Sequence, residues 1–323
     1  MIGRDLRVVR LAAIVLISVP FVAACSSNGR SVSSQPPTAK SRPVVARPSP
    51  DGWLDHLNFY RAAARLSPVT ENAAWSAADR KHAIYIVKND ALLHNEDPDN
   101  SWYTPEGQSA ARQSNLFQSS NREDTDGRAI DTWMQSPFHA IGLLDPRLVQ
   151  VGFGSYREAR STLQMGAALN VIAGISPTVQ ATYPVFWPGN DTIIPMSLQS
   201  GGPPVPLAGC PGYSAPSGLP LILQIGPGNL TPEVSATSFT QHGQPLEHCV
   251  FDETTYRNPD REQQKLGRSI LGARDAIVLI PRFPLATGTI YTASVTVNGR
   301  RHTWSFSTGS SRAQGQEHQN FSD

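Results

Sequence analysis

The sequence predicts an α+β fold in which a helix-rich first half precedes a β-rich second half. Two segments of the first half, residues 51–66 and 72–90, carry apolar residues at helical spacing. In the second half, short runs of β-branched and aromatic residues alternate with turn signals, and Asn298-Gly299 between two such runs is typical of a hairpin. Helices that precede strands, rather than alternating with them, favour the α+β class.

The length and the charge limit the classes of function. The chain has 323 residues, of which 39% are hydrophobic, and this is enough for two globular domains. The formal net charge is +1 and the basic residues are spread along the chain. We therefore expect no nucleic-acid partner, because such binding requires clustered basic residues.

The N-terminus is typical of an exported, lipid-anchored protein. Three arginines precede an apolar stretch at residues 11–24, which is too short to be an ordinary membrane-spanning helix and indicates a signal peptide over residues 1–24. Val22-Ala23-Ala24-Cys25 resembles the lipobox of bacterial lipoproteins, in which the cysteine thiol receives a diacylglyceryl group. The sequence thus predicts cleavage before Cys25, an anchor in the membrane and a location in the bacterial cell envelope, outside the cytoplasm.

The segments that flank the predicted folded part are polar. The range 25–50, which begins with Cys25, is rich in Ser and Pro and predicts a disordered tether. Residues 310–323 are also polar and predict a disordered tail. Once Cys25 is acylated, the remaining cysteines are Cys210 and Cys249. An even pair in an exported protein predicts one disulfide.

The first half divides into helices, loops and strands as follows. We expect helices at 51–66, 72–90, 108–115 and 128–134, polar loops at 95–107 and 116–127, and strands at 151–154 and 163–174. The loop 95–107 leaves His94 at its rim and contains Trp102 and Tyr103. His139 follows Pro137, whose fixed φ gives the imidazole a stiff support. His82, on the second helix, is expected to be a packed or half-exposed residue rather than a ligand.

Five motifs in the first half resemble the CAP superfamily, which includes cysteine-rich secretory proteins, antigen 5 and plant pathogenesis-related proteins. They are N-x-x-R at 58–61, an aliphatic pair before His94, Asn115-Leu116, W-M-x-S-P-x-H at 133–139 and V-G-F-G at 151–154. The resemblance covers residues 51–175 and implies an α-β-α sandwich around a small antiparallel sheet.

In the second half, the sequence from Leu285 to Gly309 resembles the end of bacterial immunoglobulin-like domains. We therefore expect a CAP domain at 51–175, a linker at 176–188 and an all-β immunoglobulin-like sandwich domain at 189–309.

The resemblance also implies a cleft that contains His94 and His139. Some CAP proteins bind a divalent metal such as zinc there, and others bind sterols or fatty acids. Ser114 stands where the family carries a carboxylate, so Asp131 or Glu106 would have to supply the acidic group. This substitution makes an enzymatic function less favoured than a binding function. The predicted cleft residues are His94, His139, Ser114, Asn115, Trp102 and Tyr103, and no catalytic residue is assigned.

Three hypotheses for function follow. The leading one is an envelope protein that binds a hydrophobic ligand or an envelope component in this cleft. The second is a metal-assisted hydrolase in which His94 and His139 hold zinc. The third is a non-catalytic interaction or scaffold protein. A serine hydrolase is disfavoured, because Ser114 and Ser136 lack the flanking glycines of a nucleophile elbow.

Overall fold

The computed structural model of the chain describes residues 52–160 and 162–309. The predicted signal peptide, the lipidation of Cys25, the tether and the C-terminal tail lie outside the described residues. The described part mixes helices and sheets, and this confirms the α+β class.

The first half contains five helices and five strands among the described residues. The helices are α1 (Trp53–Ala63), α2 (Ala73–Asn89), α3 (Pro105–Ala111), α4 (Asp126–Met134) and α5 (Pro137–Leu143). The strands are β1 (Thr70–Glu71), β2 (Ser114–Ser119), β3 (Gln150–Val151), β4 (Phe153–Arg157) and β5 (Met165–Asn170). Three of these form an antiparallel sheet in the order β2-β5-β4, and β1 pairs with β3 in parallel.

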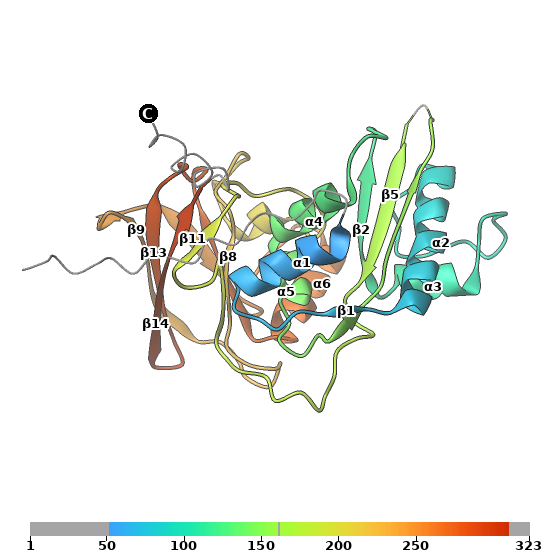
Figure 1. Cartoon of the computed structure of the whole chain (residues 1–323). Coiled ribbons are helices and arrows are strands. Elements are labelled where there is room, and N and C mark those ends of the chain that lie inside the picture. The colour runs from blue at the N-terminus through green and yellow to red at the C-terminus, as the bar shows by residue number, and fades with distance from the viewer. Residues whose placement is uncertain (1–51, 161, 310–323) are drawn as a thin grey trace, which may run out of the picture. The chain divides into compact units, whose positions relative to one another are not determined.

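Helices cover both faces of the β2-β5-β4 sheet (Figure 1). On one face, Gly154 lies so close to α2 that a Cβ there would be 2.0 Å from the backbone nitrogen of Arg80. On the other face, Phe153 stacks on Trp53 of α1 with ring centroids 5.1 Å apart and meets Trp133 of α4 edge-on. Because successive strand residues point to opposite faces, V-G-F-G supplies one residue to each helix layer.

The N-x-x-R motif at 58–61 is a structural clamp. Asn58 exchanges two hydrogen bonds with the backbone of Val69, at 2.8 and 3.0 Å. Arg61 is buried, and its guanidinium donates to the carbonyl oxygens of Ser67, Leu143, Asp145 and Leu148. The motif therefore fixes α1 to the chain that leads into β1 and to the loop after α5.

Two expectations for the middle of the first half were wrong. The short helix begins and ends earlier than the predicted range 108–115, and part of the predicted polar loop 116–127 is strand β2. Leu116 and Phe117 are buried in this strand, which pairs with the fully buried β5. The strand therefore depends on a partner about fifty residues further along the chain.

The second half contains two sheets and one α-helix among the described residues. Its elements are β6 (Val185–Trp187), β7 (Thr192–Ile194), the 3-10 helix η1 (Pro206–Gly209), β8 (Leu221–Gln224), β9 (Val234–Gln241), β10 (Gln244–Pro245), β11 (His248–Phe251), α6 (Arg261–Gly272), β12 (Ala276–Pro281), β13 (Ile290–Val297) and β14 (Arg300–Thr308). The sheet orders are β10-β9-β13-β14-β7 and β11-β12-β8-β6. Asn298 and Gly299 both have positive φ, as a tight hairpin turn requires, and they join β13 to β14.

The second half departs from the all-β expectation at α6. This helix of 12 residues begins after Asp260, whose side chain accepts hydrogen bonds from the backbone of Glu262 and Gln263. The range 176–188, expected to be a linker, contains β6, which pairs with β8. None of the helices in residues 52–160 and 162–309 is long and apolar enough to cross a membrane.

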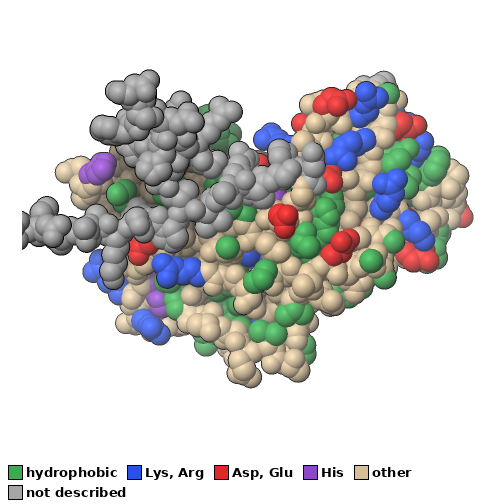
Figure 2. Space-filling model, viewed as in Figure 1, with side chains coloured by type: hydrophobic (Ala, Val, Ile, Leu, Met, Phe, Trp, Pro, Cys, Tyr) green, Lys and Arg blue, Asp and Glu red, His purple; other side chains and the backbone are tan. Residues whose placement is uncertain are grey.

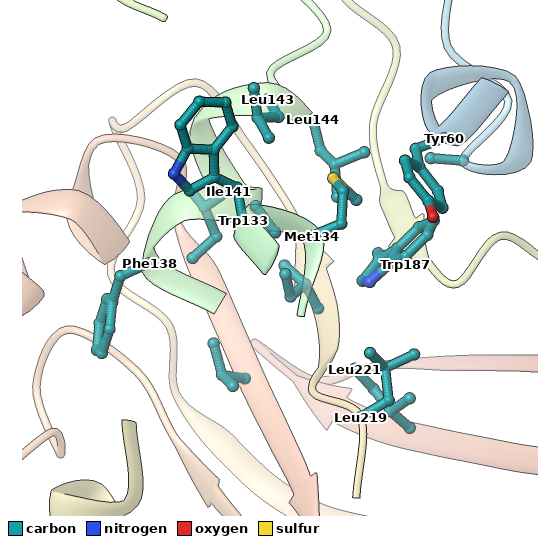
Figure 3. Packing of buried hydrophobic residues seen from close by; sticks show 14 of the residues in the cluster. Tyr60, Trp133, Met134, Phe138, Ile141, Leu143, Leu144, Trp187, Leu219 and Leu221 are labelled. Carbon is teal, nitrogen blue, oxygen red and sulfur yellow. The ribbon is translucent and has the colours of Figure 1, made fainter. Parts of the chain in front are cut away.

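The two halves share buried contacts. Figure 3 shows Tyr60 of α1 beside Trp187 of β6, and both belong to one hydrophobic cluster that also contains Trp133, Met134 and Phe138. Phe138 lies 6.0 Å from Phe251 and 5.0 Å from Tyr256, between ring centroids. A polar contact adds to these, because the buried Asp145 receives hydrogen bonds from Arg147 and from Arg274 of the second half.

The predicted Cys210–Cys249 disulfide is present in the structure and is confirmed. It joins the end of η1 to β11, with the two Cα atoms 5.6 Å apart. On the face shown in Figure 2, acidic and basic side chains are interspersed.

Candidate functional site

The structure brings four of the six predicted cleft residues to one cavity of about 380 Å³. His94, Ser114, Asn115 and His139 all line it. They come from the loop after α2, the start of β2 and the first turn of α5. The cavity is the candidate functional site.

His94 is oriented by a backbone carbonyl. Its Nδ1 lies 2.6 Å from the carbonyl oxygen of Ala111, at the end of α3. Only a protonated ring nitrogen can donate a hydrogen bond to a carbonyl oxygen, so Nδ1 carries the proton. In the neutral ring, Nε2 is then the acceptor. The imidazole therefore has a defined tautomer in its neutral form.

His139 is held in the first turn of α5. Pro137 occupies the first turn and Ser136 is the N-cap residue, with its Oγ 3.0 Å from Nδ1 of His139. Burial, with a smaller contribution from repulsion by His94, lowers the pKa of His139 to about 4. The imidazole is therefore neutral at neutral pH, while its partly exposed edge faces the cavity.

Ser114 and Asn115 are the first two residues of β2, and their side chains form hydrogen bonds to α2 and α5. Ser114 is buried and its hydroxyl donates a 2.7 Å hydrogen bond to Oδ1 of Asp79. The Asn115 amide donates to the carbonyl oxygen of His139 at 3.2 Å, which fixes α5 against β2.

Asp79, on α2, is a residue that the sequence analysis missed. Its side chain is fully buried, and burial raises its pKa to about 7 against the opposing effect of the hydrogen bond from Ser114. In the sequence, Asp79 lies four residues after Trp75, close to the predicted buried face of the helix. A single carboxylate at such a position is only a weak signal for a functional residue.

Trp102 and Tyr103 are not among the residues that line the cavity. Trp102 is exposed in the loop before α3, and the Lys88 ammonium lies 4.6 Å from the centroid of its indole ring. The apolar wall is instead formed by Phe138, Val171, Ile172, Leu266 and Ile270. The last two belong to α6 and were not predicted.

The acidic residues proposed as substitutes lie elsewhere. The carboxylate of Asp131 lies 2.6 Å from Nε2 of His56, within hydrogen-bond distance, and accepts a hydrogen bond from the hydroxyl of Tyr60. Glu106 forms an exposed ion pair with Lys81. Neither side chain lines the cavity.

Another carboxylate, Glu96, is buried against His82 at 2.8 Å, and His82 is the packed helix residue that was expected. Burial lowers the pKa of His82, and the contact with Glu96 opposes this shift. Glu96 is thus engaged with His82 and does not line the cavity.

The donor set does not fit a resident zinc ion. Catalytic zinc sites use three protein ligands and structural sites use four, whereas His94 and His139 supply two. In residues 52–160 and 162–309, no group of three or more His, Cys, Asp or Glu side chains is placed to hold a metal.

Comparison with known families supports the sequence resemblance. Residues 54–165 match the model of the cysteine-rich secretory protein family, CAP. This segment is similar to CAP domains. The matched segment contains His94, Ser114, Asn115 and His139, whereas α6 lies outside it. CAP domains are typically extracellular. No curated protein gave a significant match to the chain.

Proposed function

We propose that the protein binds a hydrophobic ligand or a cell-envelope component in the cavity next to His94 and His139. The observation that carries this proposal is the chemistry of the cavity wall. Its volume of about 380 Å³ lies within the range of small-molecule sites. Apolar side chains of Phe138, Val171 and Ile172 form one wall, and polar side chains that include His94 and His139 line the rest.

The proposal places this cavity outside the cytoplasm, on a protein anchored to the membrane through Cys25. It is supported by the signal-peptide pattern, the lipobox-like VAAC sequence and the match to a family whose domains are typically extracellular. The Ser- and Pro-rich segment after Cys25 would separate the folded part from the bilayer.

For the second half, we retain the assignment of an immunoglobulin-like domain at 189–309 as part of the proposal. Two sheets of mainly antiparallel strands and a disulfide support it. Helix α6 is an addition to such a sandwich, and it is the element that reaches the cavity.

The described geometry gives little support to hydrolysis. Ser136 contacts His139, but its side chain is buried and no acidic side chain lines the cavity to orient the imidazole. Ser114 is also buried, with its hydroxyl donated to Asp79. The third hypothesis, a scaffold protein, predicts that changes to the cavity leave binding of partners unaltered.

Native mass spectrometry of the mature protein extracted with membrane lipid tests the proposal. We expect a bound apolar molecule, and we expect Ile172→Asn to reduce its occupancy because this half-exposed side chain lines the cavity. Phe283→Asn is the matched control, since Phe283 is exposed and lies outside the cavity lining. A protein free of ligand, or equal loss in both variants, contradicts the proposal.

A further inference from the structure

Helix α6 of the second half forms part of the cavity wall. Leu266 and Ile270 both line the cavity and are four residues apart, so they lie on the same face of the helix. Leu266 is 49% exposed although it is a large apolar residue. A leucine exposed inside a cavity is available for contact with a ligand.

The close approach of α6 to α5 depends on Gly267. A Cβ at this position would lie 2.6 Å from Cε1 of Tyr256 and 3.2 Å from Cε1 of Phe138. The absence of a side chain at Gly267 thus lets the helix pack on these two rings. This packing holds the neighbouring Leu266 at the cavity.

The charges at the cavity are all of one sign. Its lining includes Arg112 and Arg274 together with two histidines, and no Asp or Glu. Arg274 forms an ion pair with Asp145 at 3.1 Å, but Asp145 also pairs with Arg147, so this group of three side chains keeps one positive charge. Arg112 is exposed, and within the described ranges it has no ion-pair partner. It contributes an uncompensated positive charge.

Arg112 is held beside the histidine end of the cavity. It is the C-cap residue of α3 and follows Ala111, whose carbonyl oxygen bonds to His94. The cavity therefore has an apolar wall contributed by α6 and a cationic side chain at the end of α3. This combination is complementary to a molecule with an apolar body and one negative group.

We propose that the cavity selects an anionic amphiphile, with Arg112 facing the negative group and Leu266 and Ile270 of α6 contacting the apolar body. This inference rests on the proposed function and makes it more specific. Arg112 determines the charge of the ligand, and α6 contributes to affinity for its apolar part. The volume of about 380 Å³ suits a compact body better than a molecule with two long chains.

A pair of fluorescent probes tests the inference. 8-Anilinonaphthalene-1-sulfonate and N-phenyl-1-naphthylamine share an aromatic body, and only the first carries a negative sulfonate. Both are titrated into the mature polypeptide from residue 25 with Cys25→Ser, which cannot be acylated. We expect the anionic probe to bind about two- to fivefold more tightly than the neutral one, the effect of one exposed ion pair.

Two substitutions separate the charge from the apolar contact. Arg112→Gln removes the preference for the anionic probe and leaves the Kd of the neutral probe unchanged. Leu266→Asn raises the Kd of both probes about threefold or more, because apolar contact is lost. The matched controls Arg122→Gln and Phe283→Asn, at exposed sites outside the cavity lining, leave both Kd values unchanged.

The possible failures are distinguishable. If neither probe binds, the proposed function fails together with the inference. If both probes bind equally, or if Arg112→Gln leaves their ratio unchanged, the anion selectivity is wrong and the proposed function stands. If Leu266→Asn alters neither Kd while its melting curve matches that of the parent, α6 has no part in binding.

Discussion

The hydroxyl of Ser114 donates a 2.7 Å hydrogen bond to the carboxylate of Asp79. The serine that occupies the carboxylate position implied by the CAP resemblance is thus itself bonded to a carboxylate from α2. That carboxylate is fully buried, so it supports β2 from behind the cavity and does not line it.

Asp79→Asn should change the dependence of stability on pH. Burial raises the folded-state pKa of Asp79 from 3.8 to about 7, so the folded state binds more protons than the unfolded state between these values. The contribution of this group to stability is therefore present at low pH and is lost as pH rises through 7. At pH 8 we expect Asp79→Asn to melt a few degrees higher than the parent, a shift that corresponds to about 1–2 kcal/mol. Near pH 4, where the contribution of Asp79 is almost fully present, the two melting temperatures should lie close together. A melting difference that is the same at both pH values would contradict this, and Asp55→Asn at an exposed site is the control.

His139 should remain neutral through the mildly acidic range. Burial lowers its folded-state pKa from 6.5 to about 4, so the unfolded chain binds more protons between these values. Stability should therefore fall as pH decreases from 6.5 to 4, and His139→Gln should remove this part of the decrease. The ring resonances of His139, followed by NMR, should show no titration between pH 8 and 5. A midpoint near 6.5 would refute the expectation.

Gly154→Ala should be strongly destabilising. The added Cβ would lie 2.0 Å from the Arg80 nitrogen and 2.4 Å from its Cα, which are backbone atoms of α2 and cannot move aside alone. We expect a loss of about 3 kcal/mol or more in the free energy of unfolding, measured in urea. Gly201→Ala is the matched control, because a Cβ at Gly201 meets no atom within 4 Å. Similar losses in both variants would show that contact with α2 is not the cause.

Arg61→Lys should destabilise the protein although it keeps the charge. The planar guanidinium serves four backbone carbonyls, and a single ammonium cannot reach all of them. The buried carbonyls left without a donor should cost about 2–4 kcal/mol of unfolding free energy. Arg65→Lys, at an exposed arginine whose guanidinium donates to the Asn190 carbonyl, should change the unfolding free energy by less than about 0.5 kcal/mol. An Arg61→Lys variant as stable as Arg65→Lys would disprove the clamp.

Elements with a local signal were predictable from the sequence. The periodicity of apolar residues located α1 and α2, and Asn298-Gly299 located the β13–β14 hairpin because its turn needs positive φ at both positions. Strand β2 was missed because polar residues flank its apolar residues Leu116 and Phe117. These two residues are buried only because the strand pairs with β5. Helix α6 was missed because it lies in a region dominated by strands.

The site was predictable only in part for the same reason. His94 and His139 were placed together by the resemblance to a family, not by any local pattern. Asp79 meets Ser114 only after α2 packs on the sheet, and Leu266 reaches the cavity only after α6 packs on α5. Trp102 looked like a rim residue because it follows His94 closely in sequence, but its loop turns it toward Lys88.

The position of α6 at the cavity has a consequence for how such proteins can diversify. The histidines and the residue that would choose ligand charge lie in one stretch of the chain, and the residues that would choose ligand shape lie more than a hundred positions later. Under the proposed function, substitutions along α6 would alter the preferred ligand while the histidines and the packing of α2 on its sheet stay intact. A fragment that ends before α6 would carry all five motifs that resemble the CAP superfamily and still lack one side of the cavity.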